Sequence, residues 1–336
     1  MGRRTGRGLL VVILTVGASL AWAAPTQAAR LTCLGRAATI VGTAGNDTLV
    51  GRPGPDVIVG LGGDDTITGG AGVDRICGGD GRDYLTAGSG NDLIDGGDGE
   101  DILEGYDDLL GERGGSGDDT LLGGPGPDLL FAVAGDNQLS GGDGDDSLLD
   151  GEVAGNDRFD GGSGVDGVDY EFASQGVVVD LAAGTGAGNG SDLITGTENL
   201  RGSPFASTLI GDLGPNVISG NIGDDTVRGG QGDDWVVGTY GNDAVFGEGG
   251  NDVVSFENEF GNDRISGGDG NDQIGTPPLS PVVPYGNPGN DVVTGDAGDD
   301  VIGVHDGVSG NDAADGGADV DWCVGDAGDT ITGCER

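Results

Sequence analysis

A nine-residue pattern of glycine, aspartate and aliphatic side chains runs through most of the chain. Aligned from Gly42, the first three units read GTAGNDTLV, GRPGPDVIV and GLGGDDTIT. Residues 42–149 hold twelve consecutive nonapeptides, and further units follow at 202–255, 267–275 and 286–303. Glycine recurs at the fourth place, aspartate at the sixth and an aliphatic residue at the eighth. A period kept at three separate places predicts a repeat architecture.

Each place in the unit has a structural role. Glycine allows positive φ angles and close backbone approach, so the GGxGxD half is predicted to be a turn. The following x-aliphatic-x half forms a short strand whose central side chain points inward. With two units per coil, the inward side chains stack into two facing columns. These begin with Leu49, Ile67, Leu85 and Leu103 on one side and with Ile58, Ile76 and Ile94 on the other. The pattern therefore predicts an all-β fold, a parallel β-roll that is a β-solenoid with two strands per coil.

The sixth-place aspartates are expected to line the two edges of this roll. The unit Gly105–Arg113 (GYDDLLGER) lacks the fourth-place glycine, the sixth-place aspartate and the eighth-place aliphatic residue. Because it is nine residues long, it is counted as a unit. On that count Asp119 shares an edge with Asp47, Asp65, Asp83 and Asp101, and the other edge begins with Asp56, Asp74 and Asp92. Rows of carboxylates at strand spacing repel one another. Turn carbonyls and one aspartate from each of two adjacent coils offer about six oxygen ligands, which suits Ca²⁺.

Composition and charge favour the same chemistry. The 336 residues include 77 glycines, 58 acidic residues and only 14 basic ones, all arginine, for a formal net charge of −44. Such a surface repels nucleic acid, so no nucleic-acid partner is expected. An aromatic content of 4% argues against a conventional close-packed core. A charge this large opposes compaction unless a cation neutralises it.

The repeats resemble the GGxGxDxUx nonapeptide of the RTX, or haemolysin-type, calcium-binding proteins. The resemblance covers nearly all of the chain beyond residue 29, except 170–201 and the two cysteine-containing ends, and is greatest to exported members made almost wholly of repeats. It implies a β-roll with several Ca²⁺ ions bound in the GGxGxD turns, between successive coils. The metal ligands that it implies here are Asp47, Asp56, Asp65, Asp74, Asp83, Asp92, Asp101, Asp119, Asp128, Asp146, Asp157, Asp166, Asp225, Asp234, Asp243, Asp252, Asp263, Asp272, Asp291 and Asp300.

Some turns depart from the family pattern. Leu110, Asn137, Ser207 and Asn216 stand where aspartate is expected, so these steps are predicted to bind Ca²⁺ weakly or not at all. Pairs of intact turns indicate on the order of ten ions. The alternative is a disordered segment rich in glycine and aspartate, which the regular aliphatic place disfavours.

The first 29 residues read as a signal peptide. A basic start (MGRRTGR) precedes an apolar run ending near Ala24, and Thr26-Gln27-Ala28 fits the small-x-small cleavage rule. Removing three arginines with this segment gives a formal charge of −44 − 3 = −47. We expect a secreted, extracellular protein without a membrane span, with an uncleaved anchor as the alternative. Family members exported in one step carry a C-terminal signal instead.

The four cysteines predict two disulfides, because an even number outside the cell is typical of a disulfide framework. They lie in two groups near opposite ends of the chain, which favours Cys33–Cys77 and Cys323–Cys334, although four cysteines allow three pairings. A zinc site is disfavoured because there is no C-x-x-C and His305 is the only histidine.

The repeats predict four segments: the signal peptide 1–29, an N-terminal β-roll block 30–169, an interrupting strand and loop segment 170–201, and a C-terminal β-roll block 202–336. Within the interruption, VVVDL at 177–181 and Leu193-Ile194 read as strands. The proline-rich run TPPLSPVVPY at 276–285 reads as a loop. The interruptions are either tolerated insertions or places where a partner binds.

The sequence contains no recognisable catalytic constellation, so we expect no enzyme. It lacks H-E-x-x-H, and its paired carboxylates cannot be separated from the aspartate ladder. The leading hypothesis is a secreted Ca²⁺-binding protein that folds on meeting extracellular Ca²⁺ and serves as a surface or matrix component. Two alternatives are a Ca²⁺-dependent module for cell-surface or extracellular polysaccharide, stacked on outward Tyr84 or Trp235, and a polysaccharide-modifying enzyme on a parallel solenoid.

Overall fold

The computed structural model describes residues 31–105, 117–151, 155–188, 190–255, 261–275, 289–304 and 312–335. The predicted signal peptide, the proline-rich loop, Leu110 and His305 lie outside these residues. All described residues lie in the unit Leu31–Arg336.

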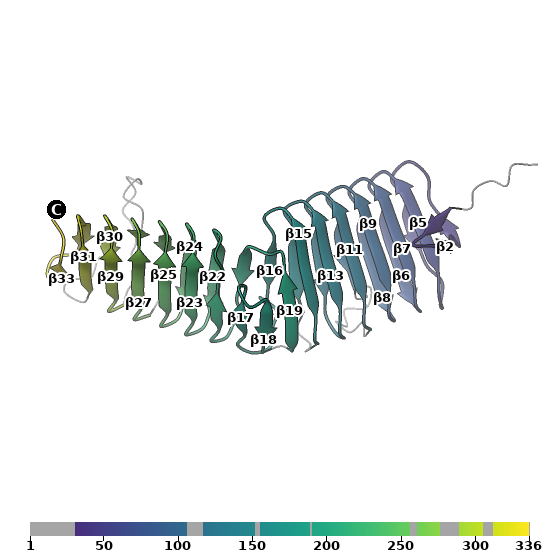
Figure 1. Ribbon diagram of the computed structural model, residues 1–336. Helices are drawn as coiled ribbons and strands as arrows, with labels where there is room; N and C mark the ends of the chain where they lie inside the picture. Colours follow the sequence, from purple (N-terminus) through teal and green to yellow (C-terminus); the bar gives the residue numbers. More distant parts are fainter. Residues whose placement is uncertain are drawn as a thin grey trace, which may run out of the picture. The chain divides into compact units, whose positions relative to one another are not determined.

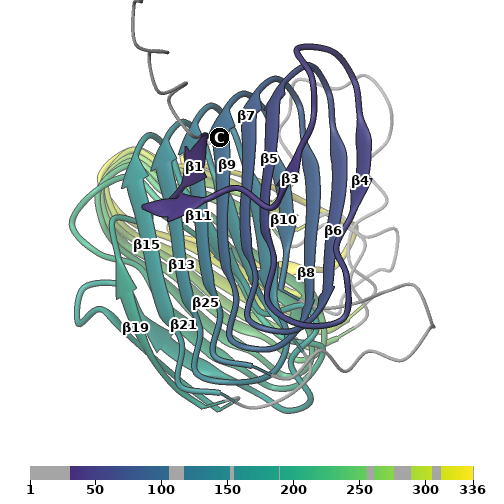
Figure 2. The ribbon, with the colours of Figure 1, turned by 90° about the vertical axis from the view of Figure 1, so that its right-hand side faces the viewer.

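The described chain is all β, and its strands build two long sheets that face one another (Figures 1 and 2). The first sheet has fourteen parallel strands, one for each coil. Its strands are β4 (Thr48–Val50), β6 (Thr66–Ala71), β8 (Tyr84–Ser89), β10 (Ile102–Glu104), β12 (Leu129–Ala132), β14 (Ser147–Asp150), β16 (Gly167–Asp169), β20 (Asn199–Arg201), β22 (Val217–Ile222), β24 (Trp235–Tyr240), β26 (Val253–Ser255), β28 (Gln273–Ile274), β30 (Val301–Val304) and β32 (Trp322–Gly325).

The second sheet has seventeen strands. They are β3 (Ile40–Val41), β5 (Val57–Gly62), β7 (Arg75–Asp80), β9 (Leu93–Asp98), β11 (Thr120–Pro125), β13 (Gln138–Asp143), β15 (Arg158–Ser163), β17 (Val178–Asp180), β18 (Thr185–Ala187), β19 (Ser191–Thr195), β21 (Thr208–Ile210), β23 (Thr226–Gln231), β25 (Ala244–Gly249), β27 (Arg264–Asp269), β29 (Val292–Ala297), β31 (Ala313–Ala318) and β33 (Thr330–Thr332). A short antiparallel hairpin, β1 (Thr32–Cys33) with β2 (Arg36–Ala37), precedes the roll. The predicted parallel β-roll is confirmed.

The core consists of the eighth-place side chains, which stack in two columns between the sheets. Column neighbours are direct partners across adjacent strands, as in Leu85 with Leu103 and Ile76 with Ile94. These four side chains are fully buried. The two predicted columns are therefore confirmed, and most coils contribute one aliphatic side chain from each sheet, with Phe159 as an aromatic exception.

The second place of the unit takes positive φ angles where one coil lies against the next, which favours glycine although Leu61 and Thr239 also occupy it. Gly79 has φ of +123°, and a Cβ atom added there would lie 2.3 Å from the carbonyl oxygen of Leu61, one coil earlier. A side chain at this position would meet both a strained backbone and a backbone clash. The glycine at this place therefore permits the close spacing of successive turns.

The stacking register changes once in the N-terminal half of the roll. Leu103 pairs with Leu130, and Ile94 pairs with Leu121, so 27 residues separate partners here instead of the usual 18. One extra nonapeptide therefore lies between β10 and β11. Counting in nines from Gly42 therefore assigns Asp119 and Asp128 to the wrong edges of the roll.

The only antiparallel pairs within the two described sheets lie in the interrupting segment. Strand β18 pairs antiparallel with β17 and with β19, while β19 continues the parallel stack from β15 and β17 continues it toward β21. The strands predicted around Val177 and Leu193 are present as β17 and β19. The segment inserts a hairpin into one sheet without interrupting the other.

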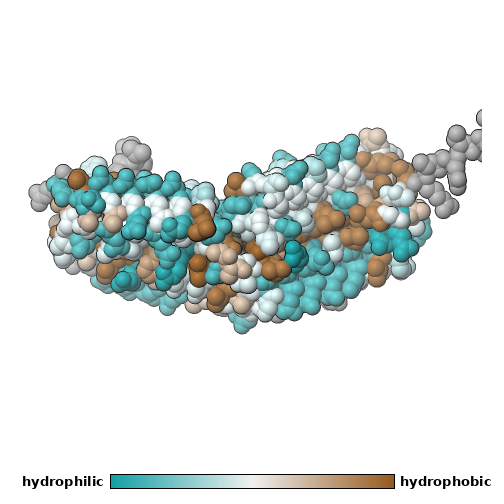
Figure 3. Space-filling view, viewed as in Figure 1, coloured by the Kyte–Doolittle hydropathy of each residue, from teal (hydrophilic) through white to brown (hydrophobic). Residues whose placement is uncertain are grey.

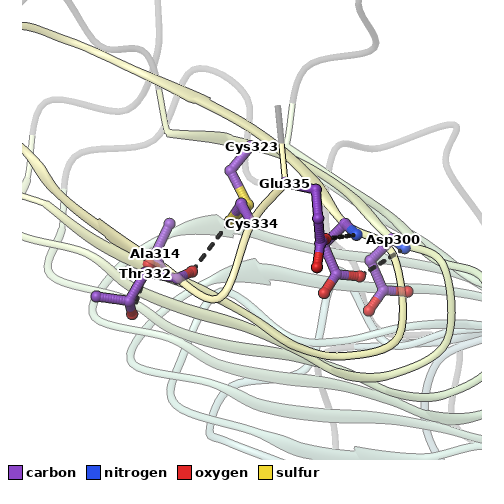
Figure 4. Close-up of a disulfide and its surroundings, with 7 residues drawn as sticks. Asp300, Ala314, Cys323, Thr332, Cys334 and Glu335 are labelled. Carbon is purple, nitrogen blue, oxygen red and sulfur yellow. Dashed lines mark hydrogen bonds between the residues drawn. A yellow bond between two sulfur atoms is a disulfide. The ribbon is translucent and has the colours of Figure 1, made fainter.

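Both predicted disulfides are present. Cys33–Cys77 joins the β1–β2 hairpin to β7, and Cys323–Cys334 joins β32 to the last described residues (Figure 4). The outer surface drawn in Figure 3 is mostly hydrophilic, with scattered hydrophobic patches. Among the described residues, no helix has the length and hydropathy needed to cross a bilayer.

Candidate metal centres

Sixth-place aspartates form a hydrogen-bonded ladder between coils. The backbone N–H of Asp65 donates to Oδ1 of Asp83 at 2.8 Å, and the N–H of Asp83 donates to Oδ1 of Asp101 at 2.8 Å. Each aspartate thus holds the turn of the preceding coil through one carboxylate oxygen. These three side chains are almost fully buried, because the turns of adjacent coils close over them.

The roll has one such ladder on each edge. The first edge carries Asp47, Asp65, Asp83, Asp101, Asp128, Asp146 and Asp166, and later Asp234, Asp252, Asp272, Asp300 and Asp321. The second edge carries Asp56, Asp74, Asp92, Asp119, Asn137, Asp157 and Asp192, and later Asp225, Asp243, Asp263, Asp291, Asp312 and Asp329.

The edge predicted for Asp119 is wrong. Its Oδ1 accepts the N–H of Asp92, so it lies on the second edge, while Asp101 donates to Asp128. The physical reason is the extra nonapeptide between β10 and β11, where the unit Gly105–Arg113 has no aliphatic residue at its eighth place.

The second carboxylate oxygen of most of these aspartates is buried and has no hydrogen-bond partner among the described residues. This holds for Oδ2 of Asp65, Asp74, Asp83, Asp92, Asp101, Asp128, Asp146, Asp166, Asp225, Asp234, Asp243, Asp252, Asp272, Asp300 and Asp321. Burying an ionised oxygen without a donor is strongly unfavourable, so each atom requires a cation or a proton.

A backbone carbonyl lies close to each unpartnered oxygen. A Cβ atom added to Gly78 would lie 2.1 Å from Oδ2 of Asp83 and 2.6 Å from the carbonyl oxygen of Gly96, in the next coil. The same arrangement recurs at Gly123, with Asp128 and Gly141 at 2.4 and 2.5 Å. The first-place glycine thus leaves a small space beside two oxygens from adjacent coils.

Desolvation is the main influence on the acidity of these carboxyls. Burial raises the pKa of Asp119, Asp128 and Asp272 to about 7, and that of Asp83 to about 6. The N–H donated from the preceding coil lowers these pKa values in part, and the charge of the preceding aspartate on the same edge raises them further. Without a cation, the ladder therefore takes up protons near neutral pH.

The first coil differs from the rest. Oδ2 of Asp47 accepts the N–H of Thr43 at 2.5 Å, and Oδ2 of Asp56 accepts the N–H of Arg52 at 2.6 Å. These two predicted ligands are already hydrogen-bonded through the oxygen that is unpartnered elsewhere. Among the other predicted positions, Asp157, Asp263 and Asp291 join the ladder through Oδ1.

Sequence reasoning missed several members of the two ladders. Asp192, Asp312, Asp321 and Asp329 occupy ladder positions, and two glutamates, Glu198 and Glu335, accept the N–H of Asp166 and Asp321. Signals for the aspartates were present in GSDLIT, GNDAAD, GGADVD and GDTIT, each of which keeps a short stretch of the repeat. Glutamate in this role has no counterpart in the nonapeptide pattern.

The fifth-place residues form a different, exposed ladder. The N–H of Arg82 donates to Oδ1 of Asp64 at 3.1 Å, and the N–H of Asp299 donates to Oδ1 of Asn271 at 2.8 Å. These side chains face solvent. Their charged and amide groups are therefore not desolvated as the sixth-place carboxylates are.

The donor set fits Ca²⁺. Calcium accepts carboxylate and backbone carbonyl oxygens in flexible geometry, and both kinds of oxygen meet beside each first-place glycine. No group of three or more acidic, histidine or cysteine side chains converges within the described part of the chain, so backbone carbonyls must supply much of any coordination. Asp83, the carbonyl of Gly96 and their equivalents along both edges would hold the ion.

Comparison with known proteins identifies the repeats. The family model for the RTX calcium-binding nonapeptide repeat matches residues 41–76, 77–108, 113–148, 201–236, 228–258, 259–275 and 285–303, which is more than half of the chain. No curated protein sequence matches it. The matched residues include parts of both edge ladders, with their glycine turns, on either side of residues 149–200. The chain therefore belongs to the family of RTX calcium-binding nonapeptide repeat proteins.

Proposed function

We propose that the protein is secreted, folds into its β-roll on binding extracellular Ca²⁺, and serves as a non-enzymatic component of a cell surface or extracellular matrix. The chain is a calcium-binding repeat protein on a β-solenoid. Its two ladders would gain Ca²⁺ between successive coils, so that each ion neutralises carboxylates and joins neighbouring turns.

The observation that carries this proposal is the row of buried, unpartnered Oδ2 atoms beside backbone carbonyls. At Asp83 the unpartnered oxygen and the carbonyl of Gly96 lie at the same first-place glycine, and this arrangement recurs along both edges. A divalent cation is the species that satisfies a buried carboxylate and a carbonyl together.

Export is supported by the disulfides and by the family. Disulfides persist in oxidising compartments, and both cysteine pairs of this chain are at disulfide distance. RTX repeat proteins are typically exported. Recovery of the protein from the culture medium, with an N-terminus at Ala29 or Arg30, would support cleavage of the predicted signal peptide. Retention in the cell with Met1 intact would contradict it.

The calcium stoichiometry tests the proposal itself. The oxidised protein, stripped with chelator, is titrated with Ca²⁺ and with Mg²⁺ by isothermal titration calorimetry, and bound ions are counted by native mass spectrometry. We expect on the order of ten Ca²⁺ ions per chain, and weaker binding of Mg²⁺, which requires near-octahedral geometry. Binding of one ion or none would contradict the proposal.

A specific feature favours polysaccharide binding as a second candidate function. The outer face of the first sheet has a hollow lined by Ser147, Gly167, Asn199, Arg201 and Val217 among others. Gly167 presents no side chain there. Val217 pairs with Trp235, whose indole is 54% exposed on the same face.

An exposed indole beside amide, hydroxyl and guanidinium groups suits a sugar ring, which has both apolar and polar surfaces. Retention of uronate or neutral polysaccharides on the immobilised, Ca²⁺-loaded protein, with loss of retention in Trp235→Ala, would support this function. The same assay run with product analysis would reveal a polysaccharide-modifying enzyme. No retention of any polymer would remove both alternatives.

A further inference from the structure

The aspartate ladder ends and restarts in the middle of the roll. On the first edge, the N–H of Asp166 donates to Oε2 of Glu198 at 2.9 Å, and the ladder resumes with Asn216, whose N–H donates to Asp234. On the second edge, the N–H of Asp157 donates to Asp192, and the ladder resumes with Ser207, which donates to Asp225. Residues 170–216, here called the seam, thus lie between two complete ladders.

In the seam, a tyrosine hydroxyl occupies the position that a cation would take. Oη of Tyr170 donates to Oδ2 of Asp192 at 3.0 Å, which is the oxygen left unpartnered in other coils. A Cβ atom added to Gly186 would lie 2.5 Å from this hydroxyl and 3.1 Å from Oδ2 of Asp192. The space that holds a carbonyl oxygen elsewhere therefore contains an O–H donor here.

On the opposite edge, an amide replaces the carboxylate. Oδ1 of Asn216 accepts the N–H of Asp212 at 2.9 Å, and its Nδ2 donates to the carbonyl oxygen of Glu198 at 2.7 Å. Ser207, the corresponding residue of the second edge, donates its hydroxyl to the carbonyl of Phe205 at 2.8 Å. Both groups are neutral and hydrogen-bonded, so they neither need nor attract a divalent cation.

The seam shares aromatic ring pairs with the coils before it. Tyr170 and Phe159 are the two largest fully buried side chains in the described chain, and their rings meet edge to face at 6.2 Å. Phe172 packs on Phe131 at 5.3 Å, and Arg201 forms ion pairs with Asp169 and Glu171. Aromatic packing and a fixed cation thus replace what metal ions would supply.

The C-terminal ladders end in the same way as the N-terminal ones. Oε2 of Glu335 accepts the N–H of Asp321 at 2.8 Å, beside the Cys323–Cys334 disulfide (Figure 4). Glutamate thus closes the first-edge ladder at residue 198 and again at residue 335. Each half of the roll therefore has its own beginning and its own end.

We propose that the seam is a calcium-independent joint that divides the roll into two separate calcium arrays, residues 47–166 and residues 225–321. Tyr170 and Asn216 hold the joint by donating hydrogen bonds at places where most other coils present only carboxylate acceptors. The division into two calcium arrays rests on the proposed calcium binding, whereas the hydrogen-bonded joint does not.

The test compares Asn216→Asp and Tyr170→Phe with wild type and with Asn271→Asp. The last variant adds the same charge at an exposed fifth-place position where other units carry aspartate. In Ca²⁺, Asn216→Asp should bind one more ion than wild type or Asn271→Asp, as counted by native mass spectrometry. In chelator, hydrogen exchange of the wild type should leave peptides of β16–β22 better protected than peptides of either array.

The same chelator samples separate this proposal from the proposed function. Asn216→Asp removes the amide donor to Glu198, and Tyr170→Phe removes the donor to the buried Asp192 carboxylate. Each should lower protection of β16–β22 at least about threefold, while Asn271→Asp changes it little. If wild type binds no Ca²⁺, the proposed function fails, and this chelator comparison still decides the joint. Equal protection of seam and arrays in chelator, or equal exchange in Asn216→Asp and Asn271→Asp, would overturn the proposal.

Discussion

Oδ1 of Asp83 accepts the backbone N–H of Asp65 at 2.8 Å, while Oδ2 of Asp83 is buried and has no hydrogen-bond partner. One carboxylate thus has two tasks: it fixes the turn of the preceding coil, and it presents a charged oxygen beside the carbonyl of Gly96. The first task needs only an acceptor, whereas the second needs a charge. The two tasks can be separated by substitution.

Asp83→Asn keeps the Oδ1 acceptor and removes the charge. We expect this variant to bind one or two fewer Ca²⁺ ions, because the carboxylate lies between adjacent coils, and to need a higher Ca²⁺ concentration to fold. Asp64→Asn makes the same charge change at an exposed fifth-place residue and should bind as wild type does. Equal stoichiometry of the two variants would show that the sixth-place carboxylate is not a ligand.

Gly78→Ala fills the space beside that carboxylate. Its Cβ would lie 2.1 Å from Oδ2 of Asp83 and 2.6 Å from the carbonyl of Gly96, so we expect the Ca²⁺-loaded form to lose roughly 1–3 kcal/mol in free energy of unfolding. Gly45→Ala is the matched control, since a Cβ there meets nothing within 4 Å. The thermal unfolding midpoints of both variants are measured in saturating Ca²⁺. Equal midpoints would contradict the close contact described for Gly78.

The carboxylate ladder predicts opposite pH dependence with and without calcium. Because burial raises the pKa of Asp119 and Asp128 from 3.8 to about 7, the metal-free roll binds protons that the unfolded chain releases. This contribution to stability is fully present below pH 3.8 and is lost as the pH rises through about 7. Calcium needs the ionised form, so its affinity rises over the same interval.

Two titrations test the direction of this pH dependence. From pH 5.5 to pH 8, the Ca²⁺ concentration at the folding midpoint should fall about tenfold or more, because several coupled carboxyls lose protons. In chelator, residual β structure should decrease over the same interval. A calcium midpoint independent of pH would mean that these carboxyls are not the binding groups.

The N-terminal disulfide predicts a local effect. Cys33 is fully buried and joins the β1–β2 hairpin to Cys77 across 44 residues. Replacing both cysteines by serine should cost about 2–4 kcal/mol and expose the first coils before the rest. Hydrogen exchange should increase in peptides of β1–β7, while peptides near Cys323 remain unchanged. A uniform increase along the chain would contradict a local role.

Strict periodicity made the fold and most ladder positions predictable from the sequence. The aliphatic place determined the two core columns, and the clustering of Cys33 with Cys77 determined the disulfide. The edge of Asp119 was mispredicted because a skipped unit of nine residues leaves the period intact in the sequence. The sequence gives one signal of this change, because Gly105–Arg113 has no aliphatic residue at its eighth place to add to a core column.

The repeat pattern could not predict the hydrogen bonds of the seam. The interaction between Tyr170 and Asp192 joins residues of an irregular segment, and it depends on how the hairpin of β17 and β18 enters the sheet. The replacement of aspartate at Asn216 was visible, but its amide bond to the carbonyl of Glu198 was not. Side-chain partners set by tertiary packing leave no periodic trace.

The most direct measurement is a Ca²⁺ titration of the mature, oxidised protein, stripped with chelator and followed by far-ultraviolet circular dichroism. The account predicts a cooperative gain of β structure as Ca²⁺ is added, with no equivalent gain in Mg²⁺. A full β spectrum in chelator that Ca²⁺ leaves unchanged would contradict the central claim that calcium drives the folding of the roll.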